Sequence, residues 1–99
     1  MKRLDKQASR QRWRELRDLW NEYDPIGVMG GPDSPQDEYE AYVGQTMRLL
    51  EQGASAAEIK KYLRTVSQHM GLRFGGWRAK RYSNRFVRWY QERWRDTIV

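Results

Sequence analysis

The chain has 99 residues, of which 19 are Lys or Arg and 13 are Asp or Glu, so its formal net charge is +6 at pH 7. A domain this small needs large side chains in its core, because it buries a limited share of its surface. The lack of cysteine excludes disulfides, iron–sulfur clusters and thiolate zinc sites. We find no apolar signal-peptide segment and no apolar run near ~20 residues, and we expect a soluble cytoplasmic protein.

Helical spacing of apolar residues runs through the whole chain and predicts an all-α fold. We expect a compact bundle of about four helices in a single domain that covers residues 1–99. The predicted helices span residues 5–22, 35–52, 56–70 and 78–97. No segment keeps the alternation of apolar and polar residues that is typical of a strand, so no strand is predicted.

The first predicted helix has an apolar face with spacings of three and four residues, formed by Trp13, Leu16, Leu19, Trp20 and Tyr23. Asp24 precedes Pro25, and a residue before proline disfavours helical geometry, so the helix should end there. Residues 26–34 are rich in glycine and predict a loop, whose Ile26 and Val28 should pack against the core.

The second and third helices have recognisable ends. Ser34 and Pro35 are typical of a helix start, and Gly53 is typical of a left-handed helix end. Ser55 and Glu58 form a capping-box pattern. The fragment LLEQGASAAEIKKYL resembles the front of a helix-turn-helix, but residues 63–70 continue in helical register without a second turn. We therefore favour two ordinary neighbouring helices joined by a capped turn.

The arginine-rich C-terminal segment, residues 73–99, contains eight basic and two acidic residues and so carries a charge of +6. One arc of its predicted helix is aromatic and should pack into the core: Tyr82, Phe86, Trp89, Tyr90 and Trp94. The opposite arc is basic and contains Arg81, Arg85, Arg88 and Arg95. Trp77 lies off the aromatic arc, beside a glycine hinge, and is the aromatic residue that we expect to be exposed.

Residue patterns for catalysis and metal binding are weak. His69 is the single histidine, and neither Ser55 nor Ser67 has an evident activating base. The acidic run at residues 37–40 is explained by the positive end of a helix, since a hard-cation site needs several converging oxygens. We expect no enzyme, no cofactor and no metal site.

Two segments, LWNEYDPIGV at residues 19–28 and residues 37–72, together resemble a group of small, mostly uncharacterised bacterial helical proteins. That group shares a W-x-x-x-D-P-I-G-V turn, a D-E-Y-x-x-Y helix and a G-A-S capped helix. The positions that match are Trp20, Asp24, Pro25, Asp37, Glu38, Tyr39 and Tyr42. The resemblance implies a helical bundle and carries over no catalytic residue. It does not include residues 73–99, which we interpret as this protein's own addition.

The sequence favours a non-enzymatic binding protein that docks its basic C-terminal helix on an acidic protein surface, such as a small bacterial or phage inhibitor of the immunity or anti-defence type. The predicted partner-binding residues are Trp77, Arg78, Arg81, Arg85, Arg88 and Arg95. Arginine suits this role because its planar fork binds carboxylates and phosphates. The alternative is nucleic-acid binding through the same arginines, aided by Arg10, Lys60 and Lys61. Membrane-surface docking ranks last, and the oligomeric state stays open.

Overall fold

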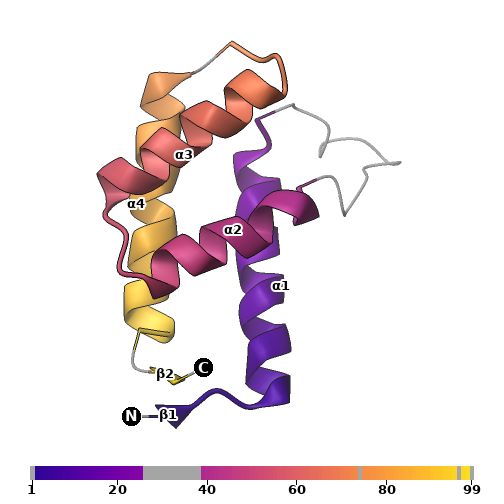
Figure 1. Cartoon of the computed structure of the whole chain (residues 1–99), viewed down its shortest axis with the longest axis vertical. Helices are drawn as coiled ribbons and strands as arrows, with labels where there is room; N and C mark the ends of the chain where they lie inside the picture. The colour runs from indigo at the N-terminus through magenta and orange to yellow at the C-terminus, as the bar shows by residue number, and fades with distance from the viewer. Residues whose placement is uncertain (1, 26–38, 74, 96, 99) are drawn as a thin grey trace.

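The computed structural model describes residues 2–25, 39–73, 75–95 and 97–98. Within them lie four helices, which are α1 (Lys6–Tyr23), α2 (Glu40–Glu51), α3 (Ala56–His69) and α4 (Gly76–Arg93). Two-residue strands β1 (Lys2–Arg3) and β2 (Thr97–Ile98) pair in parallel. The predicted all-α bundle is confirmed. The prediction of no strand is wrong by this one short pair, which brings the two ends of the chain together (Figure 1).

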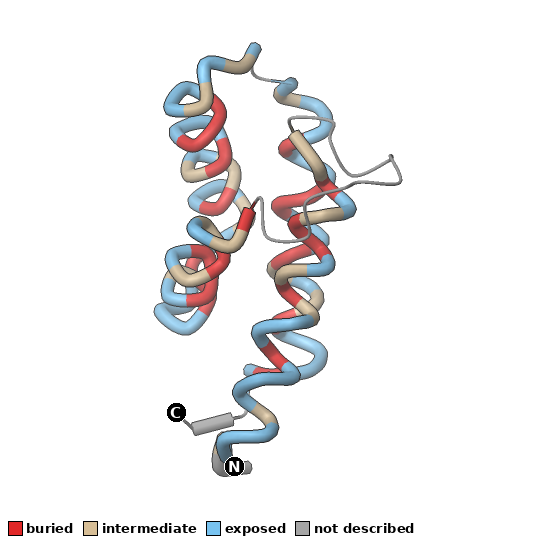
Figure 2. The backbone as a smooth tube through the Cα atoms, turned by 90° about the vertical axis from the view of Figure 1, so that its right-hand side faces the viewer, coloured by how far each residue is buried: buried red, intermediate tan, exposed pale blue. Residues whose placement is uncertain are grey.

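The helices form two layers. α1 and α4 lie side by side and run in opposite directions, and α2 and α3 cross in front of them (Figure 1). Seen from the side, the buried positions lie where the two layers face each other (Figure 2). The amphipathic spacing of each helix produces this arrangement, because each apolar stripe is covered by the opposing layer and by the neighbouring helix of its own layer.

Side chains at the helix ends explain most of the boundaries. Asp5 caps α1 by accepting a hydrogen bond of 2.7 Å from the amide of Ala8. Ser55 caps α3 by accepting one of 3.2 Å from the amide of Glu58, which confirms the predicted capping box. Gly53 and Gly71 follow α2 and α3 with φ of 82° and 73°, in the left-handed region that glycine enters without strain.

The predicted boundaries of two helices, α2 and α4, differ from the structure. α2 begins at Glu40, and Tyr39, predicted to lie inside the helix, precedes its first turn. The predicted start at Ser34 and Pro35, like the loop with Ile26 and Val28, lies outside the described residues. α4 was predicted over residues 78–97 but begins at Gly76 and ends at Arg93. Its C-terminal end was wrong because the chain leaves helical geometry at Trp94, where φ is −129°, and then enters β2.

Trp20 of α1 lies at the centre of the core and has no exposed surface. Its ring centroid is 5.8 Å from the rings of both Tyr39 and Phe86, and its Nε1 donates a hydrogen bond of 3.0 Å to Oγ1 of Thr46. Asp24, directly after α1, accepts a hydrogen bond of 2.6 Å from the Tyr39 hydroxyl. The end of α1 is thus joined to α2 and to the residue before it. The Trp20 indole and the Tyr39 hydroxyl both have a hydrogen-bond acceptor, and the rings of Trp20, Tyr39 and Phe86 pack together.

One residue of the predicted apolar face of α1 is placed differently. Trp13 keeps 37% of its surface exposed, while Arg12 is 5% exposed and forms an ion pair of 3.4 Å with Glu51. Arg12 lies four residues before Leu16 and so belongs to the buried stripe, whereas Trp13 lies at its edge. The Trp13 ring packs over Gly44 of α2, where an added Cβ would lie 3.5 Å from it.

Candidate binding surface

The side chains of α4 divide into three rows. The buried row faces the core and consists of Ala79, Tyr82, Ser83, Phe86 and Tyr90. Phe86, Tyr90 and Trp94 are all buried, as the aromatic arc predicted, while Trp89 is half-buried. The other two rows contain the arginines, and they differ in what they contact.

The α1-facing row consists of Arg78, Arg85 and Arg93. Nε of Arg78 donates a hydrogen bond of 3.1 Å to the backbone carbonyl of Tyr23, at the last residue of α1. Its guanidinium also lies 5.4 Å from the ring centroid of Tyr82. Arg85 forms an ion pair of 3.0 Å with Glu22. Arg78 and Arg85, both predicted to bind a partner, therefore hold α4 against α1 in this structure.

Glu15 of α1 is the acceptor at the other end of this row. One of its oxygens accepts hydrogen bonds from Nε1 of Trp89 at 2.9 Å and of Trp94 at 3.1 Å. Arg93 binds both oxygens, at 2.7 and 2.6 Å. Burial acts to raise the pKa of this carboxyl, but the hydrogen bonds from Arg93, Gln11 and the two indoles outweigh it and lower the pKa to about 2.

Arg93 was not among the predicted site residues. Its role follows from the antiparallel placement of α1, which sets Glu15 beside the end of α4 and Glu22 beside the start. The sequence contained one signal: the Arg85–Arg93 spacing of eight residues is within one residue of the Glu15–Glu22 spacing of seven. Two glutamates of α2, Glu40 and Glu51, form ion pairs with Arg17 and Arg12 of α1 and not with the arginines of α4.

The outer row consists of Trp77, Arg81 and Arg88, whose spacings of four and seven residues place them on one line along α4. Trp77 is 78% exposed, as predicted. Arg81 and Arg88 are exposed and form no ion pair or hydrogen bond with any residue in the described part of the chain. The outer row is therefore the part of the predicted site that faces solvent with its side chains available.

Arg95 was predicted to extend the same arc but lies beyond the end of the helix. Its amide donates a hydrogen bond of 2.9 Å to the carbonyl of Tyr90. Arg95 lines a small pocket beside the turn between α2 and α3, together with Leu50 and Ala54. Arg95 is therefore separated from the outer row, because the helix that would have continued the arc stops at Arg93.

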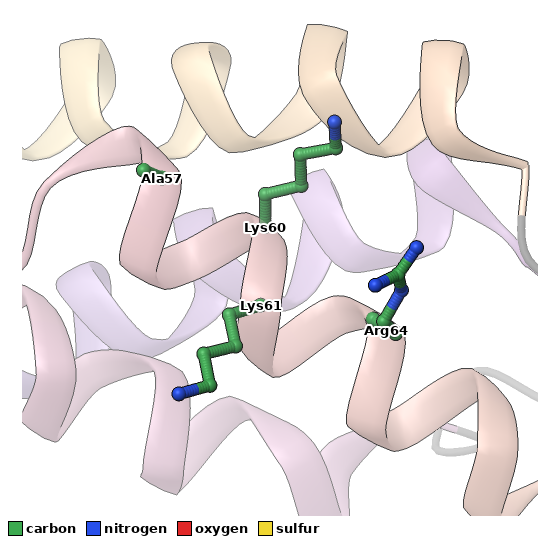
Figure 3. Close-up of a pocket in the computed structure, with 4 residues that line it drawn as sticks. All are labelled: Ala57, Lys60, Lys61 and Arg64. Carbon is green, nitrogen blue, oxygen red and sulfur yellow. The ribbon is translucent and has the colours of Figure 1, made fainter.

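A second group of cations lies on α3. Lys60, Lys61 and Arg64 line a shallow pocket with Ala57, and Figure 3 shows Lys60 and Arg64 pointing toward α4 while Lys61 points the opposite way. Next to it runs the α3–α4 groove, which we define by its lining residues: Ala56, Ala57, Lys60, Lys80, Ser83 and Asn84. The groove thus has lysines on both helices.

Within the described residues, no group of three or more His, Asp or Glu side chains converges in a way that could hold a metal ion. Asp37 and Glu38 of the predicted acidic run lie outside them. None of the helices in the described ranges combines the length and apolar composition that a membrane-spanning segment needs.

Comparisons of the chain with protein-family models, with curated proteins and with solved structures gave no match. The resemblance to small bacterial helical proteins therefore stays a prediction.

Proposed function

We propose that this protein is a non-enzymatic binding protein that docks the outer row of α4 on an acidic surface of a protein partner. The observation that carries the proposal is the 78% exposure of Trp77 in line with two arginines that have no partner among the described residues. A large aromatic side chain flanked by arginines is the composition that binding hot spots favour.

Physical chemistry supports a binding role for this row. An exposed tryptophan keeps a large apolar surface in water, and a partner's pocket would remove that surface at low cost in side-chain entropy. Arg81 and Arg88 can each form a two-pronged contact with a carboxylate. The formal net charge of +6 would also speed the approach of an acidic partner.

The class of binding protein that we propose is a small inhibitor of the immunity or anti-defence type, which acts by covering a partner's surface. This step rests on analogy with other small basic proteins of bacteria and phages. The outer row suits such a role, since it lies on a rigid helix anchored to α1 at both ends by Arg78 and Arg93.

The test is capture from a host lysate, with and without nuclease treatment, on four immobilised chains, followed by mass spectrometry. Wild type is compared with Trp77→Ala and with the pair Arg81→Glu plus Arg88→Glu. The control pair, Lys6→Glu plus Arg10→Glu, makes the same charge change at two exposed positions of α1.

We expect one protein to be captured by wild type and by the control pair but not by the outer-row variants. Affinity for that purified protein should fall by about 30-fold or more for the outer-row variants, as for a hot spot. Equal capture by all four chains would contradict the proposal. Capture that disappears with nuclease treatment would instead favour nucleic-acid binding.

A further inference from the structure

The α3–α4 groove runs directly beside the outer row. Lys60 of α3 and Lys80 of α4 both line it, and Lys80 precedes Arg81 of the outer row in the chain. Figure 3 shows the Lys60 side chain extended toward α4, so cations approach the groove from both helices. Neither lysine forms an ion pair or hydrogen bond with another residue in the ranges that the structure describes.

Beside Lys60, the α3 wall of the groove is made of two small side chains, Ala56 and Ala57. Ala56 is half-buried and Ala57 exposed, and they begin α3 on one side. Ser83 on the other side is buried, and its hydroxyl already donates a hydrogen bond of 2.6 Å to the carbonyl of Ala79. A partner's backbone could therefore come close without leaving a buried polar group of the wall unpaired.

Acidic side chains limit the basic surface on its sides. On the α1 side lies a hollow whose lining includes Asp18 and two glutamates that are already paired, Glu22 with Arg85 and Glu15 with Arg93. Glu92 follows Arg88 by one helical turn, and the exposed Glu58 lies on α3. On this surface, the cations without a partner in the described ranges are Lys60 and Lys80 at the groove and Arg81 and Arg88 in the outer row.

A few widely spaced cations fit the carboxylates of a helix better than the phosphates of a nucleic acid. The outer row extends over 11 residues, or about 16 Å, which is three helical turns, and a partner helix is about 10 Å wide. A helix can place its carboxylates opposite the cations alone. Nucleic acid carries charge at close, regular intervals, about one per 1.7 Å in a duplex, so most of its phosphates along this stretch would have no cation opposite them.

We propose that the docking segment of the partner is an acidic α-helix that lies along the α3–α4 groove, with its carboxylates between Lys60 and Lys80 and its edge against Trp77. This inference rests on the proposed function and deepens it, because it names the element that the basic surface recognises. The groove would then contribute to affinity together with the outer row.

The test uses three fluorescent probes with the full-length chain. The first is a helical peptide of about 20 residues with its glutamates on one face, at spacings of three and four. The second has the same composition with the glutamates spread around the helix, and the third is a single-stranded thymidine 20-mer. Each is titrated by fluorescence anisotropy against wild type, Lys60→Glu plus Lys80→Glu, Arg81→Glu plus Arg88→Glu, and the control pair Lys6→Glu plus Arg10→Glu.

We expect the one-faced peptide to bind wild type at least about fivefold more tightly than its spread isomer and more tightly than the 20-mer. The variant Lys60→Glu plus Lys80→Glu should bind the one-faced peptide about tenfold more weakly than the control pair, which has the same net charge. Thermal unfolding by circular dichroism, unchanged among the four chains, would show that the effect arises at the surface.

Three results would overturn the inference: equal binding of the two peptides, tighter binding of the 20-mer, or equal effects of the groove pair and the control pair. If the groove pair matches the control while Arg81→Glu plus Arg88→Glu still weakens binding, the inference fails and the proposed function stands. If the Arg81/Arg88 pair also matches the control, both fail.

Discussion

Glu15 accepts hydrogen bonds from a guanidinium and two indoles that lie more than 70 residues further along the chain. Its two oxygens satisfy donors that would otherwise be left half-buried beside the end of α4. This single carboxylate therefore fixes the positions of Trp89, Arg93 and Trp94 relative to α1.

Replacing Glu15 with Gln should lower the free energy of unfolding by about 1–2 kcal/mol at pH 7, because charge-assisted hydrogen bonds are lost. The folded carboxyl has a pKa of about 2 against an ordinary value of 4.5. On acidification the unfolded chain therefore takes up the proton first, and the stabilisation present above pH 4.5 disappears as the pH falls toward 2.

Urea unfolding of both chains at pH 7, 4 and 2.5, followed by tryptophan fluorescence, measures this. The difference in stability should shrink steadily with falling pH. A constant difference would show that Glu15 acts through packing alone.

Trp77 should contribute little to stability, because 78% of its surface is exposed. We expect Trp77→Ala to change the free energy of unfolding by less than about 0.5 kcal/mol, as is usual for surface substitutions. Urea unfolding followed by circular dichroism checks this. A loss of several kcal/mol would mean that the side chain packs against the bundle and is not available to a partner.

At the scale of the helices, α4 performs two tasks because its neighbours differ on each side. Toward α1 its arginines meet Glu15, Glu22 and the last carbonyl of α1. On the solvent side, Arg81 and Arg88 form no ion pair or hydrogen bond with any residue in the described part of the chain. A helix wheel places Arg81 and Arg85 on one arc, yet the neighbouring helix gives them different roles.

Arg78 and Arg81 provide a matched pair to test this division. Arg78→Ala removes a hydrogen bond to the carbonyl of Tyr23 and a contact with the Tyr82 ring, and should lower stability by about 1–2 kcal/mol. Arg81→Ala should be neutral within about 0.5 kcal/mol. Thermal unfolding of both variants is the measurement, and equal effects would contradict the assignment of the two rows.

At the scale of the molecule, α4 is part of the core as well as the carrier of the proposed site. Its buried residues include Phe86, which has no exposed surface, and Tyr82 and Tyr90. They cover α1 and α3, whose apolar stripes would otherwise face water. The binding surface and the stability of the fold therefore cannot be separated by truncation.

A chain that ends at Leu72 should lose its cooperative thermal transition, because the apolar faces of α1 and α3 would be exposed to water. The full chain with Arg81→Glu plus Arg88→Glu should keep that transition, since both positions are exposed. Circular dichroism and calorimetry distinguish the two. A cooperative transition in the short chain would show that the first three helices fold alone.

Much of the fold could be predicted because its signals are local. The spacing of Leu16, Leu19 and Trp20 predicted a buried face, and Ser55 with Glu58 predicted the start of α3. The exposure of Trp77 could be predicted in the same way, from its position off the aromatic arc. The burial of Arg12 was not predicted. Its position in the helical period favours burial, but a charged side chain is usually exposed.

The sequence by itself determined the helices, their caps and their apolar faces, since these depend on backbone geometry and on residues within one or two turns. Only the tertiary structure decided which cations are paired within the fold and which are left exposed without a partner among the described residues. The antiparallel packing of α1 on α4 pairs Arg85 and Arg93 with Glu22 and Glu15, and the packing of α3 on α4 brings Lys60 and Lys80 to one groove. Such pairings follow from how helices cross, and a helical period contains no information about the neighbouring helix.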